Sequence, residues 1–529
     1  MQVSYKVKQK ERTSPPMSKI CILLACAAMA ASGAAAQVIN AASCSQANVQ
    51  TALNSIAANG TTVNVPSGNC TWSGNISFST PYSFTLKGQS TATASDSHGN
   101  PTSFSDTTVI TDGQSGTGGN NSILSIGLTG SSSQVARMTG FTIHGGNVVY
   151  NGEITIDGNA GTQARVDHNH IVNVNDLAFS MYEPMTGVAD HNMFDVPAGL
   201  LYNGVRVYNT GDDYGDAPWT KPPGYGSSSF IFLENNTFNN GFANDCQSGG
   251  AYVVRYNTFN VTIATGNIGI QSHSTGSQPR DRGCRVWEVY GNWAGGGGGT
   301  IQYTLGFQTS GTGMWWGNTV TNSGFDLALV EDRDSHIYSQ TTAPNGWGYC
   351  GTTQTGSASG WDENSTSSGY ACIDQIGRGK GDLLSGYWPN VQNNTSPGVY
   401  TGVWPHQAVE PVYIWGETFS GGTLVTVNSS NNNIQANRDY YAPATSFNGT
   451  VGTGTGLFSA RPSTCTAGAG STPGVGYWAT DQNTLYVCTA TNTWTEYYKP
   501  YTYPHPLTQS GSVQSPANPS GLTGKYVVK

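Results

Sequence analysis

An asparagine recurs through the middle of the chain, each time at the same place in an apolar segment. The six instances are Asn169, Asn192, Asn236, Asn257, Asn292 and Asn318. Their spacings are 23, 44, 21, 35 and 26 residues, which we interpret as a period of about 22, with 44 as two periods and 35 as one period with an inserted loop. A repeat this short is typical of one turn of a β-solenoid, whose turns must stack to bury their apolar sides. The repeat therefore predicts an all-β chain that winds as a right-handed parallel β-helix.

The choice of asparagine has a physical reason in such a fold. Asparagine tolerates a left-handed backbone, and its amide can bond to the equivalent amide of the coil above and below. We therefore expect the six side chains to form one ladder.

The composition fits a secreted β protein with many turns. Charged residues make up only 10% of the chain and there are 69 glycines, but apolar residues reach 37%, which is enough for a core. The net charge is −9, and removing residues 1–36, whose own net charge is +4, leaves −13. Such an acidic chain argues against a nucleic-acid partner, which needs a basic face. An acidic substrate would have to meet a local basic patch.

Residues 1–36 have the pattern of a secretory signal peptide. Lys19 precedes an apolar run at 20–31, and three alanines at 34–36 offer a cleavage site before Gln37. The run of 12 residues is too short to cross a bilayer, so we expect no transmembrane anchor. The mature protein is expected to be secreted, with the periplasm or the cell surface as alternatives.

Eight cysteines follow this segment and fall into four neighbouring couples. None has the close spacing of a zinc site, and an oxidising compartment favours disulfides. Proximity in the sequence predicts the pairs Cys44–Cys70, Cys246–Cys284, Cys350–Cys372 and Cys465–Cys488.

The segments on either side of the repeat predict the domain organisation. An apolar face of Val49, Leu53 and Ile56 predicts a helix over 46–58, which would cover the open end of the solenoid. After the repeat, a polar and glycine-rich stretch reads as a linker, and alternating residues between the last two cysteines predict a small hairpin. The expected domains are the capped β-helix at 37–427, linker and polar loops at 428–464, a disulfide-closed β module at 465–510 and a tail at 511–529.

Two features resemble a known superfamily. The Val-x-Val-Pro-x-Gly strand at 63–68 follows the predicted helix, and Asp-His pairs end at His168 and His191. Together they resemble the pectate-lyase-like β-helix superfamily over about residues 44–419. The resemblance implies the β-helix fold and suggests a polysaccharide substrate. The Arg-x-Pro-x-x-Arg motif of pectate lyases is missing, and only Gln278-Pro279-Arg280 comes near it.

The residue three positions before each repeated asparagine is mostly apolar and is expected to point into the core. Because side chains alternate along a strand, the residue two positions before each asparagine is expected to point outward. Along the solenoid this column reads Asp167, Asp190, Glu234, Arg255, Tyr290 and Trp316. Adjacent coils lie about 4.8 Å apart, so neighbouring carboxylates would repel each other unless a cation lay between them. We therefore predict a Ca²⁺ site at Asp167, Asp190 and Glu234, with a solvated polar face as the alternative.

A second polar group surrounds the 35-residue spacing. Of the 17 basic residues that follow residue 36, four lie within a stretch of 31 residues. They are Arg255, Arg280 and Arg282, which lie between Cys246 and Cys284, and Arg285, which follows Cys284. A pinned loop inserted in a solenoid is a usual place for function. The alternative is a set of Arg–Asp salt bridges that hold the loop.

These two groups together predict β-elimination on a uronic-acid polymer. Removal of the C5 proton builds charge on the adjacent carboxylate, so a cation or arginine must neutralise it and a base must take the proton. Arg255 or Arg280 would contact the sugar acid, and His273 is the expected base, because histidine as a residue type ordinarily titrates near neutral pH. The expected catalytic residues are Arg255, His273, Arg280 and Asp245, and the expected substrate-binding residues are Arg282, Tyr290, Trp315 and Trp316.

Two other functions fit the same residues. A glycoside hydrolase could use Asp190 with Glu234, or Asp245 with a partner, as its carboxyl pair. A non-catalytic glycan-binding or surface-structural protein could use aromatic rings as sugar platforms. The candidate platforms are Trp315, Trp316, Trp347 and Tyr303.

Overall fold

A computed structural model describes most of the chain after residue 36. The chain divides into two units, Met1–Ala35 and Ala36–Lys529, and all described residues lie in the second. The described residues are 37–114, 122–131, 133–145, 148–149, 151–196, 202–209, 216–260, 269–273, 282–295, 305–321, 325–330, 374–381, 407–420, 423–428, 434–469 and 472–509. The predicted signal segment lies outside them. Among the described residues, no helix is both long and apolar enough to span a bilayer.

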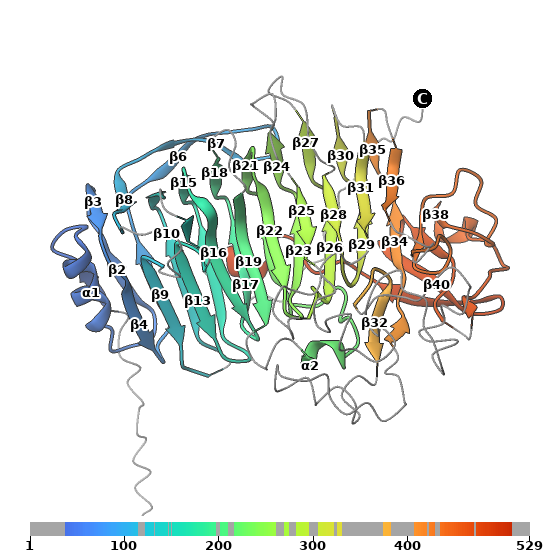
Figure 1. The fold of residues 1–529 in the computed structure, drawn as a ribbon, viewed down its shortest axis with the longest axis horizontal. Coiled ribbons are helices and arrows are strands. Elements are labelled where there is room, and N and C mark those ends of the chain that lie inside the picture. Colours follow the sequence, from blue (N-terminus) through green and yellow to red (C-terminus); the bar gives the residue numbers. More distant parts are fainter. Residues whose placement is uncertain are drawn as a thin grey trace, which may run out of the picture. The chain divides into compact units, whose positions relative to one another are not determined.

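The second unit winds into a parallel β-helix with three sheets (Figure 1). Sheet A consists of β1 (Val38–Asn40), β2 (Thr61–Asn64), β5 (Phe84–Lys87), β10 (Val135–Thr139), β14 (Gln163–Asp167), β17 (Thr186–Asp190), β20 (Ile231–Glu234), β23 (Ala251–Arg255), β26 (Val286–Tyr290), β29 (Thr312–Trp316), β34 (Val412–Trp415) and β37 (Tyr440–Tyr441). Sheet B consists of β3 (Gly68–Trp72), β8 (Thr108–Asp112), β11 (Thr142–His144), β15 (His170–Val172), β18 (Met193–Asp195), β21 (Thr237–Asn239), β24 (Thr258–Asn260), β27 (Trp293–Gly295), β30 (Thr319–Val320) and β35 (Thr418–Phe419).

Sheet C has two parts, which a parallel bridge between Phe242 and Gly269 joins. The first part contains β4 (Ile76–Thr80), β9 (Leu124–Leu128), β13 (Ile154–Gly158), β16 (Asn175–Glu183), β19 (Tyr202–Asn209) and β22 (Phe242–Gln247). The second contains β25 (Ile270–Ser272), β28 (Gly306–Gln308), β31 (Phe325–Val330) and β36 (Thr423–Asn428). Neighbouring strands in each part are parallel, as the repeat predicts.

The core lies between the three sheets and runs through every coil. Ala189 from sheet A, Phe194 from sheet B and Met181 from sheet C belong to one buried apolar cluster. Phenylalanines stack from coil to coil, with ring centres 4.7 Å apart for Phe194 and Phe238 and 5.1 Å apart for Phe238 and Phe259. Each coil thus buries apolar side chains against the coils next to it.

The repeated asparagines form the predicted ladder. The Nδ2 atom of Asn192 donates to Oδ1 of Asn236 at 3.0 Å, and Asn236 donates to Asn257 at 3.0 Å. The same contact joins Asn169 to Asn192, Asn257 to Asn292 and Asn292 to Asn318. The ladder ends on Glu417, whose Oε1 accepts from both nitrogens of Asn318. These side chains are fully buried, so the ladder satisfies polar groups that water cannot reach.

The left-handed residue lies one position before each asparagine, which corrects the expected reason for the repeat. His168, His191, Asn235 and Tyr256 have φ angles of 53° to 57°, and Gly291 and Gly317 occupy the same turn position at 65°. The repeated asparagine is needed for its amide, and the turn conformation belongs to its neighbour.

The spacing of 44 residues is one coil, so its interpretation as two coils is wrong. β17 pairs directly with β20, and Asp190 lies opposite Glu234. The extra length lies between β18 and β20, in a stretch that includes β19 and the short helix α2 (Asp216–Trp219). Glu234 is therefore one coil from Asp190.

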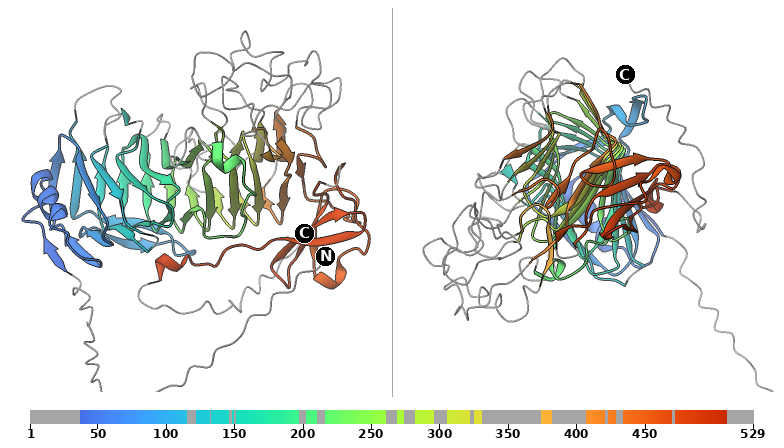
Figure 2. Two further views of the ribbon diagram at one scale, coloured as in Figure 1. Left: turned by 90° about the horizontal axis from the view of Figure 1, so that it is seen from below. Right: turned by 90° about the vertical axis from the view of Figure 1, so that its right-hand side faces the viewer.

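Both ends of the solenoid carry additional structure. Helix α1 (Gln46–Asn54) buries Val49 and Leu53 at the first coils. At the other end, the stretch assigned to a linker contributes β37 to sheet A and β38 (Thr453–Gly456) to a separate sheet. That four-stranded sheet continues with β39 (Gly476–Ala479), β40 (Thr484–Ala490) and β41 (Thr493–Tyr498) (Figure 2). Residues 440–441 and 453–456 are thus strands, which corrects the predicted linker.

Three of the predicted disulfides are present. They are Cys44–Cys70, Cys246–Cys284 and Cys465–Cys488, with Cα atoms 5.8, 5.2 and 5.8 Å apart. Cys350 and Cys372 lie outside the described residues.

Candidate functional site

The predicted column lies in register on the outer face of sheet A. Direct strand pairing joins Asp167, Asp190, Glu234, Arg255, Tyr290 and Trp316 in that order. The chain's own C-terminal segment, residues 499–509, covers much of this column (Figure 2). His505 N donates to Oε1 of Glu234 at 2.8 Å, and Leu507 packs on the same outer apolar cluster as Val188.

Arg255 is completely buried beneath this segment. Its guanidinium pairs with Glu234 at 2.6 Å and donates to the phenol oxygen of Tyr290 at 2.9 Å. The remaining donors reach the backbone oxygens of Tyr501 and Thr502 at 2.8 and 2.9 Å. Every contact is internal to the protein, which corrects the prediction that Arg255 contacts the sugar.

The three carboxylates of the column each face a guanidinium. Arg137 donates to both oxygens of Asp167 at 2.6 and 2.5 Å, and Arg165 donates to both oxygens of Asp190 at 2.8 and 2.7 Å. Burial would raise the pKa of Asp167, but hydrogen bonds from Arg137 and the charge of Arg165 outweigh it and hold the pKa below its usual range. The charge argument for Ca²⁺ at Asp167, Asp190 and Glu234 therefore no longer applies.

Two of the predicted aromatic platforms, Trp315 and Trp316, lie in the described part of the chain, and neither has an open ring face. Trp315 points into the core, edge-on to Trp287 with ring centres 6.4 Å apart. Trp316 is stacked between Tyr290 and Trp415, with ring centres 4.5 and 5.6 Å away. Sugar stacking needs an exposed ring face, so these aromatic rings stabilise the protein itself. Trp347 and Tyr303 lie outside the described residues.

Of the residues predicted near the inserted loop, the structure describes Arg282 and His273. Arg282 is buried and donates to both oxygens of Asp374, at 2.8 and 2.5 Å, so the salt-bridge alternative holds for it. His273 follows β25, and its backbone bonds to Cys246 O and Cys284 N at 2.7 and 3.0 Å. Arg280 lies outside the described residues.

Polar side chains gather instead on the outer face of sheet C. In one row across β16, β19 and β22, Ser180 lies beside Arg206 and Arg206 beside Asp245. In the next row, Tyr182 lies beside Tyr208 and Tyr208 beside Gln247. We call Tyr182, Arg206, Tyr208, Asp245 and Gln247 the sheet-C cluster.

The sheet-C cluster is held together by hydrogen bonds. Oδ2 of Asp245 accepts from Arg206 Nε at 3.1 Å and from the Tyr208 hydroxyl at 3.2 Å. The same hydroxyl lies 2.7 Å from Oε1 of Gln247. The guanidinium carbon of Arg206 sits 4.6 Å from the centre of the Tyr208 ring. Burial lowers the pKa of Arg206, but the Asp245 carboxylate more than offsets this, so the guanidinium stays charged.

A second carboxyl group belongs to this surface. Asp176 lies at the start of β16, with φ at 89°. Burial raises its pKa to about 6; Arg206 pulls the pKa down and Asp245 pushes it up. The outer face of sheet C therefore carries a hydrogen-bonded guanidinium, phenol and carboxylate, and Asp176, four residues before Ser180 on β16, interacts with them electrostatically.

Sequence reasoning named Asp245 as a candidate but did not name the residues that it contacts. A signal was present, because Phe-Ser-Met-Tyr ending at Tyr182 and Val-Arg-Val-Tyr ending at Tyr208 have the same alternation 26 residues apart. Such alternation predicts two adjacent strands with Tyr side chains on one face.

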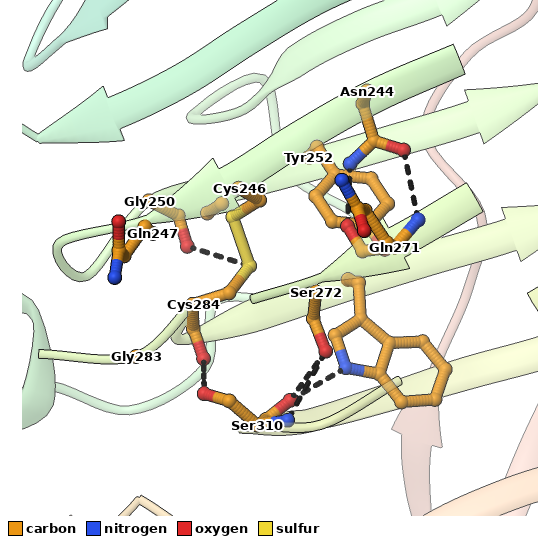
Figure 3. Close-up of a disulfide and its surroundings, with 12 residues drawn as sticks. Asn244, Cys246, Gln247, Gly250, Tyr252, Gln271, Ser272, Gly283, Cys284 and Ser310 are labelled. Carbon is orange, nitrogen blue, oxygen red and sulfur yellow. Dashed lines mark hydrogen bonds between the residues drawn. A yellow bond between two sulfur atoms is a disulfide. The ribbon is translucent and has the colours of Figure 1, made fainter. Parts of the chain in front are cut away.

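The disulfide between Cys246 and Cys284 anchors the strand that carries Asp245 and Gln247 (Figure 3). Cys246 lies between these two residues and points the opposite way, into the core. Ser310 Oγ donates to the backbone oxygen of Cys284 at 2.7 Å, which connects the bridge to the next coil. The bridge thus fixes the edge of the cluster from inside.

Replacing Cys246 and Cys284 together with alanine should lower the free energy of unfolding by about 4 kcal/mol, because the bridge closes a loop of 38 residues. Denaturant unfolding measures this change. The matched control replaces Cys465 and Cys488, whose bridge lies in the C-terminal sheet and not beside the cluster. A double variant at Cys246 and Cys284 that is as stable as the wild type would contradict an anchoring role.

Comparison with known proteins adds little to this description. No protein-family model and no curated protein matches this chain. A solved structure that it resembles is the crystal structure of an alginate lyase from Paenibacillus sp. str. FPU-7, at 14% identity and a TM-score of 0.33. The alignment covers 55% of this chain and 97% of that chain. The strand pairing within the chain, and not this likeness, establishes the parallel β-helix.

Proposed function

We propose that the protein is an extracellular enzyme that cleaves a uronic-acid polysaccharide by β-elimination at the sheet-C cluster. The observation that carries the proposal is the single hydrogen-bonded group formed by Arg206, Tyr208 and Asp245 on the outer face of adjacent coils. Three disulfides support an oxidising, extracellular location. Stacked coils also suit an extended polymer, which can lie along several strands.

The chemistry assigns a role to each group. Arg206 pairs with the sugar carboxylate and neutralises the charge that grows there as the C5–H bond breaks. Asp176, ionised at neutral pH, accepts that proton. The C4–O bond then breaks, a C4–C5 double bond forms, and the Tyr208 hydroxyl protonates the leaving oxygen. Asp245 and Gln247 hold the phenol in place through the contacts described above.

Arg206→Ala should reduce kcat/KM on a uronic-acid polymer about a hundredfold, because it removes the group that stabilises the developing charge. The assay follows the unsaturated product in the ultraviolet on pectate and alginate, with and without Ca²⁺. Arg461→Ala is the matched control, because Arg461 also lies over an aromatic ring, 4.4 Å from the centre of Phe458, but belongs to the C-terminal module. Unchanged turnover in Arg206→Ala would remove Arg206 from the site.

The pH dependence follows from Asp176. A base must be ionised to accept a proton, so kcat/KM should rise as the pH increases through about 6. Asp176→Asn should lose both the activity and this limb of the profile. If kcat/KM were constant over roughly one pH unit on either side of 6, another group would be the base.

The carboxyl pair also favours a second function, a glycoside hydrolase that uses Asp176 with Asp245. The influence of Asp245 on the pKa of Asp176 places the two groups within electrostatic reach. A general acid must be protonated, so this activity would fall as the pH rises through about 6, opposite to the lyase. New reducing ends without an ultraviolet chromophore identify the hydrolase. A glycan-binding protein without catalysis would give neither product.

A further inference from the structure

Two histidines are stacked at the corner between sheets A and B, away from the sheet-C cluster. His168 and His191 follow Asp167 and Asp190, which pair in register, so they occupy the same turn position on adjacent coils. Their ring centres are 5.0 Å apart and their planes differ by only 5°. The side chains are 44% and 35% exposed, although most of this corner of the fold is buried.

Each ring is oriented by the carboxylate that precedes it. His168 Nδ1 lies 2.7 Å from Asp167 Oδ2, and His191 Nδ1 lies 2.9 Å from Asp190 Oδ2. A carboxylate accepts a hydrogen bond, so in the neutral ring Nδ1 carries the proton and Nε2 has the free lone pair. The same carboxylate–histidine contact orients the ligands of many protein metal sites and makes them more basic.

We propose that His168 and His191 bind one divalent transition-metal ion, Zn²⁺ or Cu²⁺, through their Nε2 atoms, with water completing the coordination. Neutral imidazole is a preferred ligand of both ions, with metal–nitrogen distances of about 2.0–2.1 Å. Both rings must tilt toward each other to reach one ion, and their exposure leaves room for this movement. Ca²⁺ is not the expected ion, because it prefers oxygen ligands to imidazole nitrogen.

The charges that face the pair do not oppose a cation. Arg137 and Arg165 bring two positive charges from sheet A, and Asp167 and Asp190 bring two negative charges. These four groups cancel, so the rings do not lie in a net positive field.

Among the described residues the stack contains two imidazoles, which defines the size of the site. The equivalent turn position holds Gly140 on the coil before and Asn235 on the coil after. The Asn235 side chain is already engaged by the Tyr503 hydroxyl at 3.0 Å and by Asn100 at 3.2 Å. The site therefore offers two protein ligands and an open side toward solvent.

The test titrates the untagged, metal-free chain with Zn²⁺ and with Cu²⁺ by calorimetry, and reads nitrogen coordination from the electron paramagnetic resonance of bound Cu²⁺. His168→Asn and His191→Asn remove one imidazole each and keep the left-handed turn, because the chain itself places Asn235 there at φ 55°. We expect one ion per wild-type chain and binding weaker by about tenfold or more in each variant.

His144→Asn, which changes a histidine on sheet B, is the matched control and should bind as the wild type does. Thermal unfolding with a chelator checks that all variants remain folded. The proposal is overturned if the wild type binds no ion, if both turn variants bind as tightly as the wild type, or if His144→Asn loses as much affinity as they do. None of these readouts depends on enzyme activity.

Discussion

Arg255→Ala should lower the free energy of unfolding by about 3–5 kcal/mol, because it removes one partner of a buried ion pair. Glu234 would keep its burial but lose the guanidinium 2.6 Å away. The backbone oxygens of Tyr501 and Thr502 would lose their donors at the same time. Burial already raises the pKa of Glu234 and Arg255 counteracts this, so the variant should leave Glu234 protonated or unpaired.

Denaturant unfolding of the full chain measures the effect. Lys499→Ala is the control, because Lys499 forms an exposed ion pair with Glu496 in the same part of the chain and should contribute less than about 1 kcal/mol. If Arg255→Ala were as stable as the wild type but inactive on polysaccharide, a direct role in the sugar site would replace the structural one.

Asn236→Ala should cost about 3–5 kcal/mol, because several buried groups lose their partners at roughly 1–3 kcal/mol each. Oδ1 of Asn236 accepts from the backbone and side-chain nitrogens of Asn192, at 2.9 and 3.0 Å. Its Nδ2 donates to Ala189 O at 2.9 Å and to Asn257 Oδ1 at 3.0 Å. A methyl group replaces none of these bonds, and water cannot reach the site.

The control for the ladder is an asparagine outside it. Asn64 donates to Asn40 on the surface of sheet A at 3.0 Å, and Asn64→Ala should change stability by less than about 0.5 kcal/mol. Thermal or denaturant unfolding compares the two variants. Equal stability of Asn236→Ala and Asn64→Ala would mean that the stacked amides contribute nothing to the fold.

The repeat made the register of sheet A predictable from the sequence. Each repeated asparagine lies two residues after the end of a sheet-A strand. Aligning the asparagines therefore also aligns Asp190 with Glu234 and Glu234 with Arg255. The one error in this alignment was the 44-residue spacing, because an insertion of coil length cannot be told from a second coil by counting residues.

The cover over the column could not be predicted in the same way. The backbone oxygens that accept from Arg255 belong to Tyr501 and Thr502, which follow Arg255 by 246 and 247 positions. No repeat in the sequence links these two residues to Arg255. A weaker signal did exist, because Val188, Phe232 and Val253 lie on the outer face of sheet A and are apolar. An apolar outer face indicates that something covers it.

The sheet-C cluster was hidden for a related reason. The segments that join sheets B and C differ in length from coil to coil, so the asparagines do not fix the register of β16, β19 and β22. Trp315 shows the opposite case, because strand alternation alone points it inward once Trp316 points outward. Its assignment to the sugar site could have been rejected from the sequence.

The central claim is that substrate meets the outer face of sheet C and not the covered face of sheet A. The most direct measurement is a crystal structure of the Asp176→Asn variant with a uronate oligosaccharide bound. The account predicts a sugar carboxylate within hydrogen-bond distance of the Arg206 guanidinium and a glycosidic oxygen near the Tyr208 hydroxyl. A sugar bound at Glu234 and Arg255, with residues 499–509 displaced, would contradict it.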